Sequence, residues 1–371
     1  MVKQLFFCLL LLALLSVSAS CPATAPPGQV PWLGMGVPLP FADNLTNGPM
    51  IAMNSAWWCA GLPGCNWSDM DKGHGVYDFS NLDAFLAWWK PMGRKFILKI
   101  NDPPPADVTE THYLSRLGAL IRHMAHRFPT ADTGLWVALD NEPAWTPAGF
   151  DRHAAILARC FSRARGRLKI VGFMQIDCRP SAFKAMVDRG CANNCDAADV
   201  HMYANWYISP DLPYNPPDIS WGPHGPLYDE LMACKALLPP GMPLFCDEMG
   251  FSKEFPDRNL KAVLLMLCAH VEMIQPHLYH ASDNLVGDAT GATNSPTLDS
   301  HKFYGCWHVA SDAPAPWGQC LADIARQSMK WPAGYPTLTR SPNGDHVVIF
   351  PNGVTYRWNA LTGSPIEVVE P

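Results

Sequence analysis

Two glutamates, each placed at the end of an apolar run, are the residues of this chain best suited to chemistry. The first stands in Asn141-Glu142-Pro143 after the run LWVALD, and the second, Glu248, follows the run PLFCD. Two carboxyl groups can divide a reaction between them, because a protonated one assists a leaving oxygen while an ionised one attacks an anomeric carbon. Different surroundings and mutual repulsion keep the acid protonated and the nucleophile charged. The sequence therefore predicts a pair of catalytic carboxyl groups.

Eight short apolar runs predict the strands that position these glutamates. They lie at 32–37, 50–57, 95–101, 135–140, 169–175, 198–203, 243–247 and 274–280. Helical periodicity predicts helices at 80–92, 109–128, 150–165, 180–189, 227–237 and 258–272. Near-continuous apolar strands are typical of a parallel sheet covered on both faces. Eight of them alternating with helices predict an α/β fold of the (β/α)8 TIM-barrel type.

In such a barrel the catalytic groups lie at the carboxyl ends of the strands, where the loops converge. Glu142 follows the fourth predicted strand and Glu248 ends the seventh, on opposite sides of the barrel. We therefore expect the two carboxyl groups to face each other across its mouth, about 5 Å apart. The adjacent carboxylates Asp140 and Asp247 are expected to be structural hydrogen-bonding groups inside the barrel.

The end of the fourth strand is expected to be irregular. Pro143 biases Glu142 toward an extended backbone, which holds its carboxyl group out over the barrel mouth. In a regular strand Asn141 would point the opposite way. A twist or bulge at the strand end is needed for both side chains to reach the same site.

The Asn-Glu-Pro after strand four and the Glu that ends strand seven resemble clan A of the retaining glycoside hydrolases, a (β/α)8 superfamily. That clan includes cellulases, mannanases, xylanases and β-xylosidases. Residues 67–100 are also similar to the stretch from strand two to strand three in families 10, 39 and 42, and His201-Met-Tyr203 resembles the His-x-Tyr of family 5. The resemblance covers roughly residues 30–330.

The resemblance implies roles for individual residues. Glu142 would be the acid/base, Glu248 the nucleophile, and Asn141 a hydrogen-bond donor to the sugar 2-hydroxyl. Tyr203 would orient Glu248, and His201 would line the site. Further substrate-binding candidates are Trp145, Trp206 and His280, since aromatic faces suit the C–H faces of sugar rings. Simple packing is the alternative for the tryptophans and for the His-x-Tyr pair.

Two departures from the clan pattern stand out. No arginine ends the second strand, where Asn54 and Trp57 stand instead, and strand eight offers His280 and Asp283 in place of a tryptophan. No cofactor and no metal site is predicted, because His277 and His280 lack an accompanying carboxylate motif. The expected function is a secreted retaining glycoside hydrolase acting on β-linked polysaccharide or oligosaccharide. The alternative is a catalytically silent barrel that binds glycan.

Composition restricts the partners. The 371 residues carry 27 Lys and Arg against 33 Asp and Glu, for a net charge of -6, and contain no basic block. Nucleic acid is therefore not expected as a partner. The predicted partner is the saccharide substrate, and we expect a monomer.

The N-terminus has the pattern of a targeting segment. Lys3, an apolar run and the small residues SVSAS predict a secretory signal peptide over residues 1–20. A lipoprotein anchor at Cys21 is the alternative, which Ser18 disfavours. The apolar run is too short for a comfortable transmembrane helix, and no other stretch is long and apolar enough to span a membrane. The mature chain is predicted to divide into a catalytic barrel at 21–334 and a β-hairpin appendage at 335–371, which turns at Asn352-Gly353.

The 13 cysteines suit an oxidising compartment. Pairs close enough in sequence to join loops by disulfides are Cys59 with Cys65, Cys191 with Cys195, and Cys306 with Cys320. Connectivity stays open, and the absence of Cys-x-x-Cys disfavours zinc. Asn44 and Asn66 begin glycosylation sequons.

Overall fold

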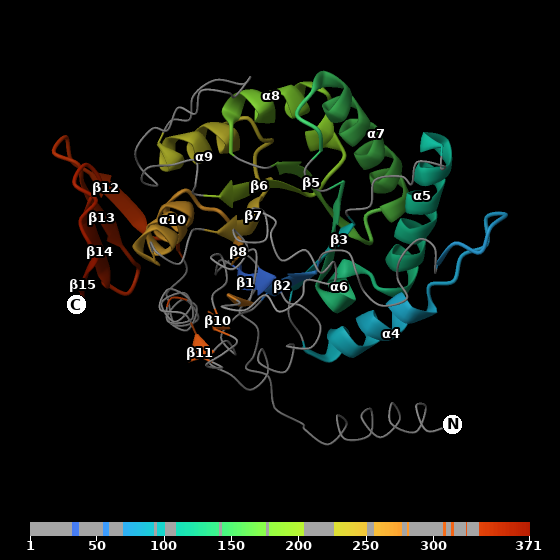
Figure 1. Ribbon diagram of the computed structural model, residues 1–371, viewed down its shortest axis with the longest axis horizontal. Coiled ribbons are helices and arrows are strands. Elements are labelled where there is room, and N and C mark those ends of the chain that lie inside the picture. Colours follow the sequence, from blue (N-terminus) through green and yellow to red (C-terminus); the bar gives the residue numbers. More distant parts are fainter. Residues whose placement is uncertain are drawn as a thin grey trace, which may run out of the picture.

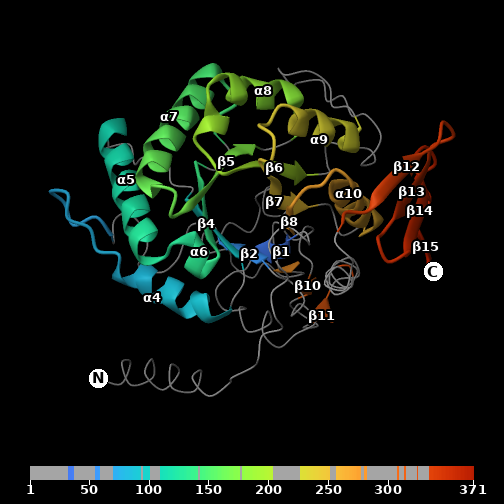
Figure 2. The same cartoon turned by 180° about the vertical axis from the view of Figure 1, so that it is seen from behind.

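The computed structural model describes fourteen parts of the chain. They are residues 32–36, 55–58, 70–92, 95–100, 109–140, 143–175, 178–203, 226–250, 256–276, 280–281, 307–308, 313–314, 324 and 334–371. Eight parallel strands form a closed ring in which each strand pairs with the next along the chain and the eighth pairs with the first (Figures 1 and 2). The expected α/β barrel is therefore present.

Each strand of the ring overlaps the run predicted for it. The strands are β1 (Trp32–Gly36), β2 (Ser55–Trp58), β3 (Lys95–Ile100), β4 (Leu135–Leu139), β5 (Lys169–Gln175), β6 (Ala197–Tyr203), β7 (Leu244–Gly250) and β8 (Met273–Pro276). The main difference lies in β7, which continues through Glu248 to Gly250. Glu248 therefore lies within a hydrogen-bonded strand and not after its end.

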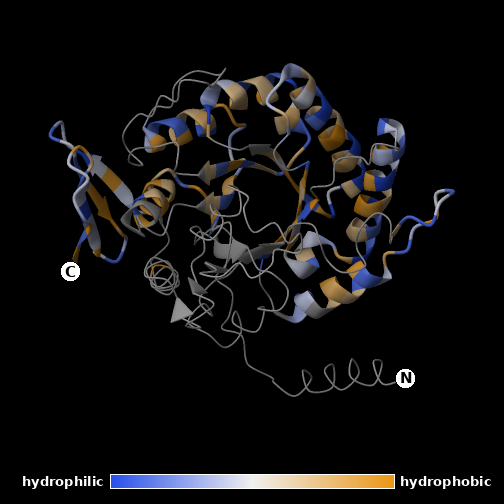
Figure 3. Cartoon of the chain, in the orientation of Figure 1, coloured by the Kyte–Doolittle hydropathy of each residue, from blue (hydrophilic) through white to orange (hydrophobic). Residues whose placement is uncertain are grey.

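The six predicted helices surround the ring (Figure 1). They are α4 (Ser80–Trp89), α5 (Glu110–Arg127), α7 (Pro147–Ala164), α8 (Pro180–Asp188), α9 (Leu227–Ala236) and α10 (Pro256–Cys268). Three short elements were not predicted: η3 (Lys90–Met92), α6 (Thr130–Thr133) and η4 (Cys191–Asn193). Orange and blue alternate along the outer helices in Figure 3, as expected of helices with one apolar face.

Capping residues explain where two of these helices begin. Thr109 caps α5 by accepting a hydrogen bond from the backbone N–H of His112. Thr146 caps α7 in the same way, through the N–H of Gly149, and Pro147 occupies the first helical position. The prediction began this helix at residue 150. The Thr-Pro pair starts it three residues earlier.

The barrel interior has an apolar layer with a polar layer above it. The apolar layer consists of Ile97, Trp136, Ala138, Val171, Ala197, Phe245 and Met273. Side chains two positions apart on a strand share a face, so the next inward positions lie closer to the carboxyl ends. Four of these positions hold the buried polar residues Lys99, Asp199, Asp247 and Gln275. The change from apolar to polar places buried charge beneath the barrel mouth.

The C-terminal segment forms an antiparallel sheet of β12 (Thr337–Arg340), β13 (Asp345–Ile349), β14 (Thr355–Asn359) and β15 (Glu367–Val369). The predicted hairpin is β13 and β14, and Gly353 in its loop has a φ of 91°. Two strands beyond the hairpin were not predicted. The sheet is attached to the helical layer, since Lys261 of α10 donates to the Ser364 carbonyl at 2.7 Å and Arg340 forms an ion pair with Asp229 of α9.

The predicted disulfide between Cys191 and Cys195 is wrong, because both residues are buried free thiols. Cys195 packs instead against β5, where a Cβ built on Gly172 would lie 3.2 Å from its Sγ. The other proposed pairs lie outside the described residues, as do the signal segment and both sequons. Within the described ranges, no helix is both long and apolar enough to cross a membrane.

Candidate active site

Five ionisable side chains from three strands of the ring, the adjacent β6 and β7 and the more distant β3, meet in the polar layer. They are Lys99 from β3, Asp199 and His201 from β6, and Asp247 and Glu248 from β7. The side chains of the first four are fully buried, and that of Glu248 is 5% exposed. Of the five, Glu248 is the one whose side chain has some exposure to solvent. We refer to these five residues as the charged cluster.

Two cationic groups converge on one oxygen of Glu248. His201 Nδ1 lies 2.8 Å from Glu248 Oε2, and Lys99 Nζ lies 3.6 Å from the same atom. Lys99 Nζ also lies 2.9 Å from Asp247 Oδ1. The ammonium group therefore bridges the two carboxylates of β7.

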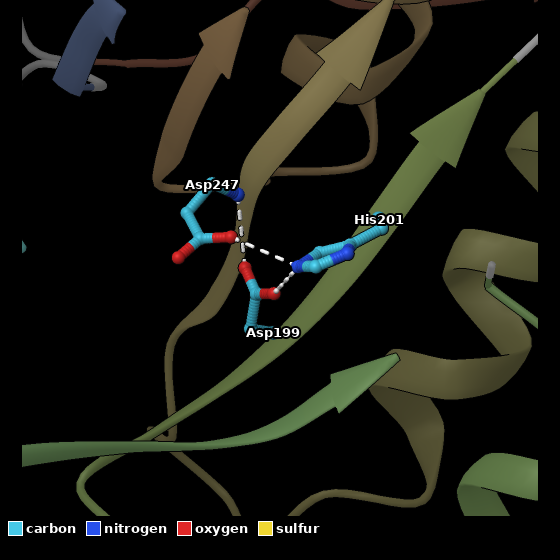
Figure 4. A group of neighbouring side chains, drawn as sticks. All are labelled: Asp199, His201 and Asp247. Carbon is cyan, nitrogen blue, oxygen red and sulfur yellow. Dashed lines mark hydrogen bonds and ion pairs between the residues drawn. The ribbon is translucent and has the colours of Figure 1, made fainter. Parts of the chain in front are cut away.

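His201 holds the other side of the cluster together. Its Nε2 lies 3.2 Å from Asp247 Oδ1 and 3.3 Å from Asp199 Oδ2 (Figure 4). Asp199 Oδ1 in turn accepts the backbone N–H of Asp247 at 2.9 Å. Asp199 thereby links the imidazole of His201 to the backbone of β7. Asp247 is a structural hydrogen-bonding group inside the barrel, as expected.

An extra residue in β7 explains how two consecutive carboxylates reach the same cluster. From Asp199 to His201 strand β6 advances two residues, while its partner β7 advances three, from Phe245 to Glu248. The pairing of β7 with β8 shifts in the same region, between Cys246 and Met249. In a regular strand Asp247 and Glu248 would face opposite sides of the sheet. The irregularity turns both inward, as a bulge does.

Burial and mutual attraction set the charges of the cluster. Burial alone would lower the pKa of Lys99, but the Asp247 and Glu248 carboxylates raise that pKa above its usual value. Burial likewise opposes the charged form of His201, yet Glu248 raises its pKa well above the usual range. Lys99 and His201 are therefore both cations beside Glu248.

The two aspartates of the cluster titrate differently. Burial, reinforced by the Asp247 charge, raises the pKa of Asp199 to about 8. Burial also disfavours ionised Asp247, but Lys99 and His201 hold its pKa below the usual value. At neutral pH, Asp247 is ionised and Asp199 is protonated. One carboxyl group thus keeps a proton while its neighbour carries the charge.

The strand that leads to the other predicted glutamate ends irregularly, as expected. Strand β4 ends at Leu139, and Asp140 has a φ of 56°, a left-handed conformation that is uncommon for a residue other than glycine. Asn141 and Glu142 lie outside the described residues, so the separation of the two glutamates stays a prediction. The backbone changes direction immediately before them.

Two residues of α7 hold Asp140 in this conformation. Arg152 Nη1 lies 2.6 Å from Asp140 Oδ1, and His153 Nδ1 lies 3.2 Å from Oδ2. Burial would raise the pKa of Asp140, but the His153 hydrogen bond and the Arg152 charge hold it below its usual value. Asp140 is thus a structural hydrogen-bonding group, as expected, although its partners lie on α7 and not within the barrel.

His153 connects two irregular strand positions. Its Nε2 accepts the backbone N–H of Phe173 at 3.1 Å, and Phe173 in β5 has a φ of 69°. Because Nε2 accepts, Nδ1 carries the ring proton and donates it to Asp140. A single buried imidazole therefore ties the end of β4 to the left-handed residue of β5.

The remaining predicted site residues have different outcomes. His201 and Glu248 are brought together, as above. Tyr203 ends β6 and His280 begins β9 (His280–Ala281), but their side chains are not described, and Trp206 lies outside the described residues. Trp145 precedes α7 and is half-buried, with the Arg179 guanidinium 5.9 Å from its ring centroid. One face of this tryptophan is therefore engaged by a protein cation.

Two members of the charged cluster were not predicted, Lys99 and Asp199. The signal for Lys99 was a lysine two positions after Ile97 in the apolar run KFILKI, which places it on the inward face. Asp199 stands two positions before His201 for the same reason. A charge at an inward position of a buried strand requires a partner, and this rule would have found both.

Several solved structures share this fold. A family 39 β-xylosidase from Caulobacter crescentus has a TM-score of 0.58 and 14% identity, covering 90% of this chain and 79% of its own. An exo-β-1,4-mannosidase from Opitutaceae bacterium strain TAV5 has a TM-score of 0.55 and 14% identity, covering 85% and 62%. A family 10 endo-β-1,4-xylanase from Gloeophyllum trabeum has a TM-score of 0.52 and 12% identity, covering 80% and 96%.

These likenesses define the fold class of the chain. It has the α/β barrel of solved glycoside hydrolases, including members of families 39 and 10, two of the families that its sequence resembles. No protein-family model matches the sequence, and no curated protein matches it. At these identities the structural similarity shows the fold, while the activity must be argued from the site.

Proposed function

We propose that this protein is a secreted retaining glycoside hydrolase that cleaves β-linked polysaccharide or oligosaccharide. The observation that carries the proposal is the setting of Glu248 in the carboxyl-terminal half of β7, where His201 and Lys99 both contact its Oε2. Two adjacent cations favour the ionised carboxylate. An ionised carboxylate at this end of an α/β barrel suits attack on an anomeric carbon.

The reaction proceeds in two displacements. In the first, a Glu248 oxygen attacks the anomeric carbon while Glu142 gives its proton to the glycosidic oxygen, and the alcohol departs. In the second, Glu142 takes a proton from water, and the resulting hydroxide displaces Glu248 from the same carbon. Two inversions leave the product with the configuration of the substrate. The roles of Glu142 and Asn141 rest on the resemblance of their sequence motif.

Substrate class and location follow from separate arguments. The similar solved structures are described as a β-xylosidase, a β-1,4-mannosidase and a β-1,4-xylanase, which supports a β-linked substrate. The N-terminal segment 1–20 supports secretion, with an anchor at Cys21 as the alternative. No cofactor is required by the two-carboxylate reaction.

The decisive experiment is a substrate panel with the product configuration followed in time. Purified protein is incubated with β-xylan, β-mannan, β-glucan and aryl β-glycosides, and the first anomer released is identified by ¹H NMR. Glu248→Gln is the control, because it keeps the shape of the side chain and removes the nucleophile. Release of the β-anomer by the wild type alone supports the proposal. An α-product argues for inversion, and binding of glycan without turnover argues for the silent barrel.

A further inference from the structure

We infer that Lys99 is a positioning residue of this site, with an ammonium group that fixes Glu248 against Asp247. The inference rests on the proposed function for its catalytic meaning. Its geometric basis is independent, since Lys99 Nζ lies 2.9 Å from Asp247 Oδ1 and 3.6 Å from Glu248 Oε2.

The position of Lys99 in β3 leaves its ammonium group no route to water. The side chain is fully buried and lies one inward position above Ile97 in the apolar layer. An unpaired ammonium group at such a place is costly, so it must be compensated by carboxylates. Lys99 is compensated by the two consecutive acids that the extra residue of β7 turns inward.

The charged cluster is balanced at neutral pH. Lys99 and His201 contribute two positive charges, and Asp247 and Glu248 contribute two negative charges. Asp199, the fifth member, carries a proton there because burial and the Asp247 charge raise its pKa to about 8. Removing the Lys99 charge leaves two carboxylates facing one imidazolium. One carboxylate must then bind a proton more readily, and Glu248 is the member whose protonation stops nucleophilic attack.

Stability alone gives little reason for such a group. Well-packed apolar residues can replace a buried ion pair at no net cost, or even with a gain. A lysine held beneath the barrel mouth is better explained by what it does to its neighbours. Its contact with Glu248 acts on the charge that the first displacement needs.

A bound metal ion is the competing explanation of the charged cluster. Ligand atoms of Asp199, His201 and Asp247 all lie within 4.8 Å of one another (Figure 4). The Lys99 ammonium group, however, already lies 2.9 Å from the Asp247 oxygen that faces this group. It would repel a divalent ion from that oxygen. The structure therefore assigns the cationic role to Lys99.

The test measures the pKa of the Glu248 carboxyl group directly, without substrate. Protein labelled with ¹³C at glutamate Cδ is titrated by NMR, and the Glu248 resonance is assigned by its loss in Glu248→Gln. In Lys99→Met we expect the pKa of Glu248 to rise by about one pH unit or more. Lys95→Met, which removes a half-buried lysine from the same strand, is the matched control and should leave it unchanged.

A second variant guards against misfolding. Lys99→Met/Asp247→Asn removes one positive and one negative charge together, so the charge balance of the cluster is kept. We expect its Glu248 pKa to lie closer to the wild-type value than that of Lys99→Met. An unchanged Glu248 pKa in Lys99→Met would overturn the inference, as would stoichiometric binding of Zn²⁺ or Mn²⁺ by the wild type in equilibrium dialysis.

The kinetic readout separates this inference from the proposed function. In an active enzyme, the acidic limb of the kcat/KM profile of Lys99→Met should move upward in pH with the Glu248 pKa. If the wild type hydrolyses no glycoside but Lys99→Met still raises that pKa, the proposed function fails and the control of Glu248 by Lys99 stands. If hydrolysis is found and the acidic limb stays in place, Lys99 has no positioning role.

Discussion

His201 and Glu248 are direct register partners on β6 and β7, and Nδ1 of the imidazole lies 2.8 Å from Oε2 of the carboxylate. Side chains of paired residues on neighbouring strands share a face, so the contact follows from the register itself. The histidine is fully buried, and its Nε2 faces Asp199 and Asp247. His201 thus fixes the orientation of the proposed nucleophile from inside the barrel.

Glu248→Ala should abolish turnover on every substrate, because no covalent intermediate can form without the carboxylate. The measurement is the release of nitrophenol or dinitrophenol from aryl glycosides. Asp247→Asn is the comparison variant, because it removes a negative charge at the adjacent position and leaves the Glu248 carboxylate in place. If Glu248→Ala turned over its substrates at the wild-type rate, the nucleophile would be another residue.

Glu142→Ala should slow poor leaving groups by about 10² to 10⁴-fold and good ones much less, because an acidic aglycone departs without protonation. The measurement compares kcat/KM for alkyl and dinitrophenyl glycosides. Added azide should partly restore turnover by attacking the glycosyl-enzyme. Equal losses on both substrates would show that Glu142 is not the acid.

Asn141→Ala should lower kcat by about 10²-fold with a much smaller change in KM, because a contact to the 2-hydroxyl tightens as charge develops at the anomeric carbon. The test includes a 2-deoxy substrate, which lacks the hydroxyl group that Asn141 would bind. On this substrate the variant should show little further loss of turnover. Normal turnover by Asn141→Ala would make the amide a structural cap of the strand.

Two substitutions of Asp140 separate the effect of its left-handed backbone on stability from the effect of its contacts with Arg152 and His153. Asp140→Ala removes the contacts with Arg152 and His153 while keeping a side chain at a φ of 56°. Asp140→Gly removes the same contacts and tolerates that φ. We expect the glycine variant to unfold with a free energy on the order of 1 kcal/mol higher than the alanine variant, measured in urea. Equal stabilities would indicate that the strand end relaxes once its carboxylate is gone.

Asp199 should make the protein less stable as the pH rises. Its pKa of about 8 in the folded protein lies above the ordinary value of 3.8, so the folded state binds the proton more tightly. The stabilisation from that proton is complete below pH 3.8 and is lost as the pH rises through 8. Asp199→Asn cannot ionise, so its Tm should fall less than that of the wild type between pH 6 and pH 9. A parallel fall in both proteins would contradict the raised pKa.

The strands and outer helices were predictable because each follows from a local pattern. The run KFILKI and the stripe of Leu117, Ile121 and Met124 on α5 carry their period in the sequence, and both are buried as expected. The starts of helices were less well predicted where capping decides, as at Thr146. Strands β12 and β15 were missed because they are short and pair only through the hairpin between them.

The charged cluster was predicted in part. Glu248 and His201 were found from their motifs, and the contact between them was not. That contact depends on the register of β6 with β7, which long-range pairing determines. The disulfide between Cys191 and Cys195 was predicted from spacing alone, and spacing does not show that the Cys195 side chain packs against Gly172.

The irregularity in β7 has a consequence for engineering. Which acids face the inside of the barrel is decided by how many residues lie between Phe245 and Glu248, and not by what those residues are. A substitution at Cys246 would leave this count unchanged, whereas deleting one residue would restore the regular alternation and turn one of the two carboxylates outward. The number of residues in this part of β7 therefore decides which carboxylates lie inside the barrel. Grafting β7 into another barrel would transfer the site only if the neighbouring strand supplied the same offset.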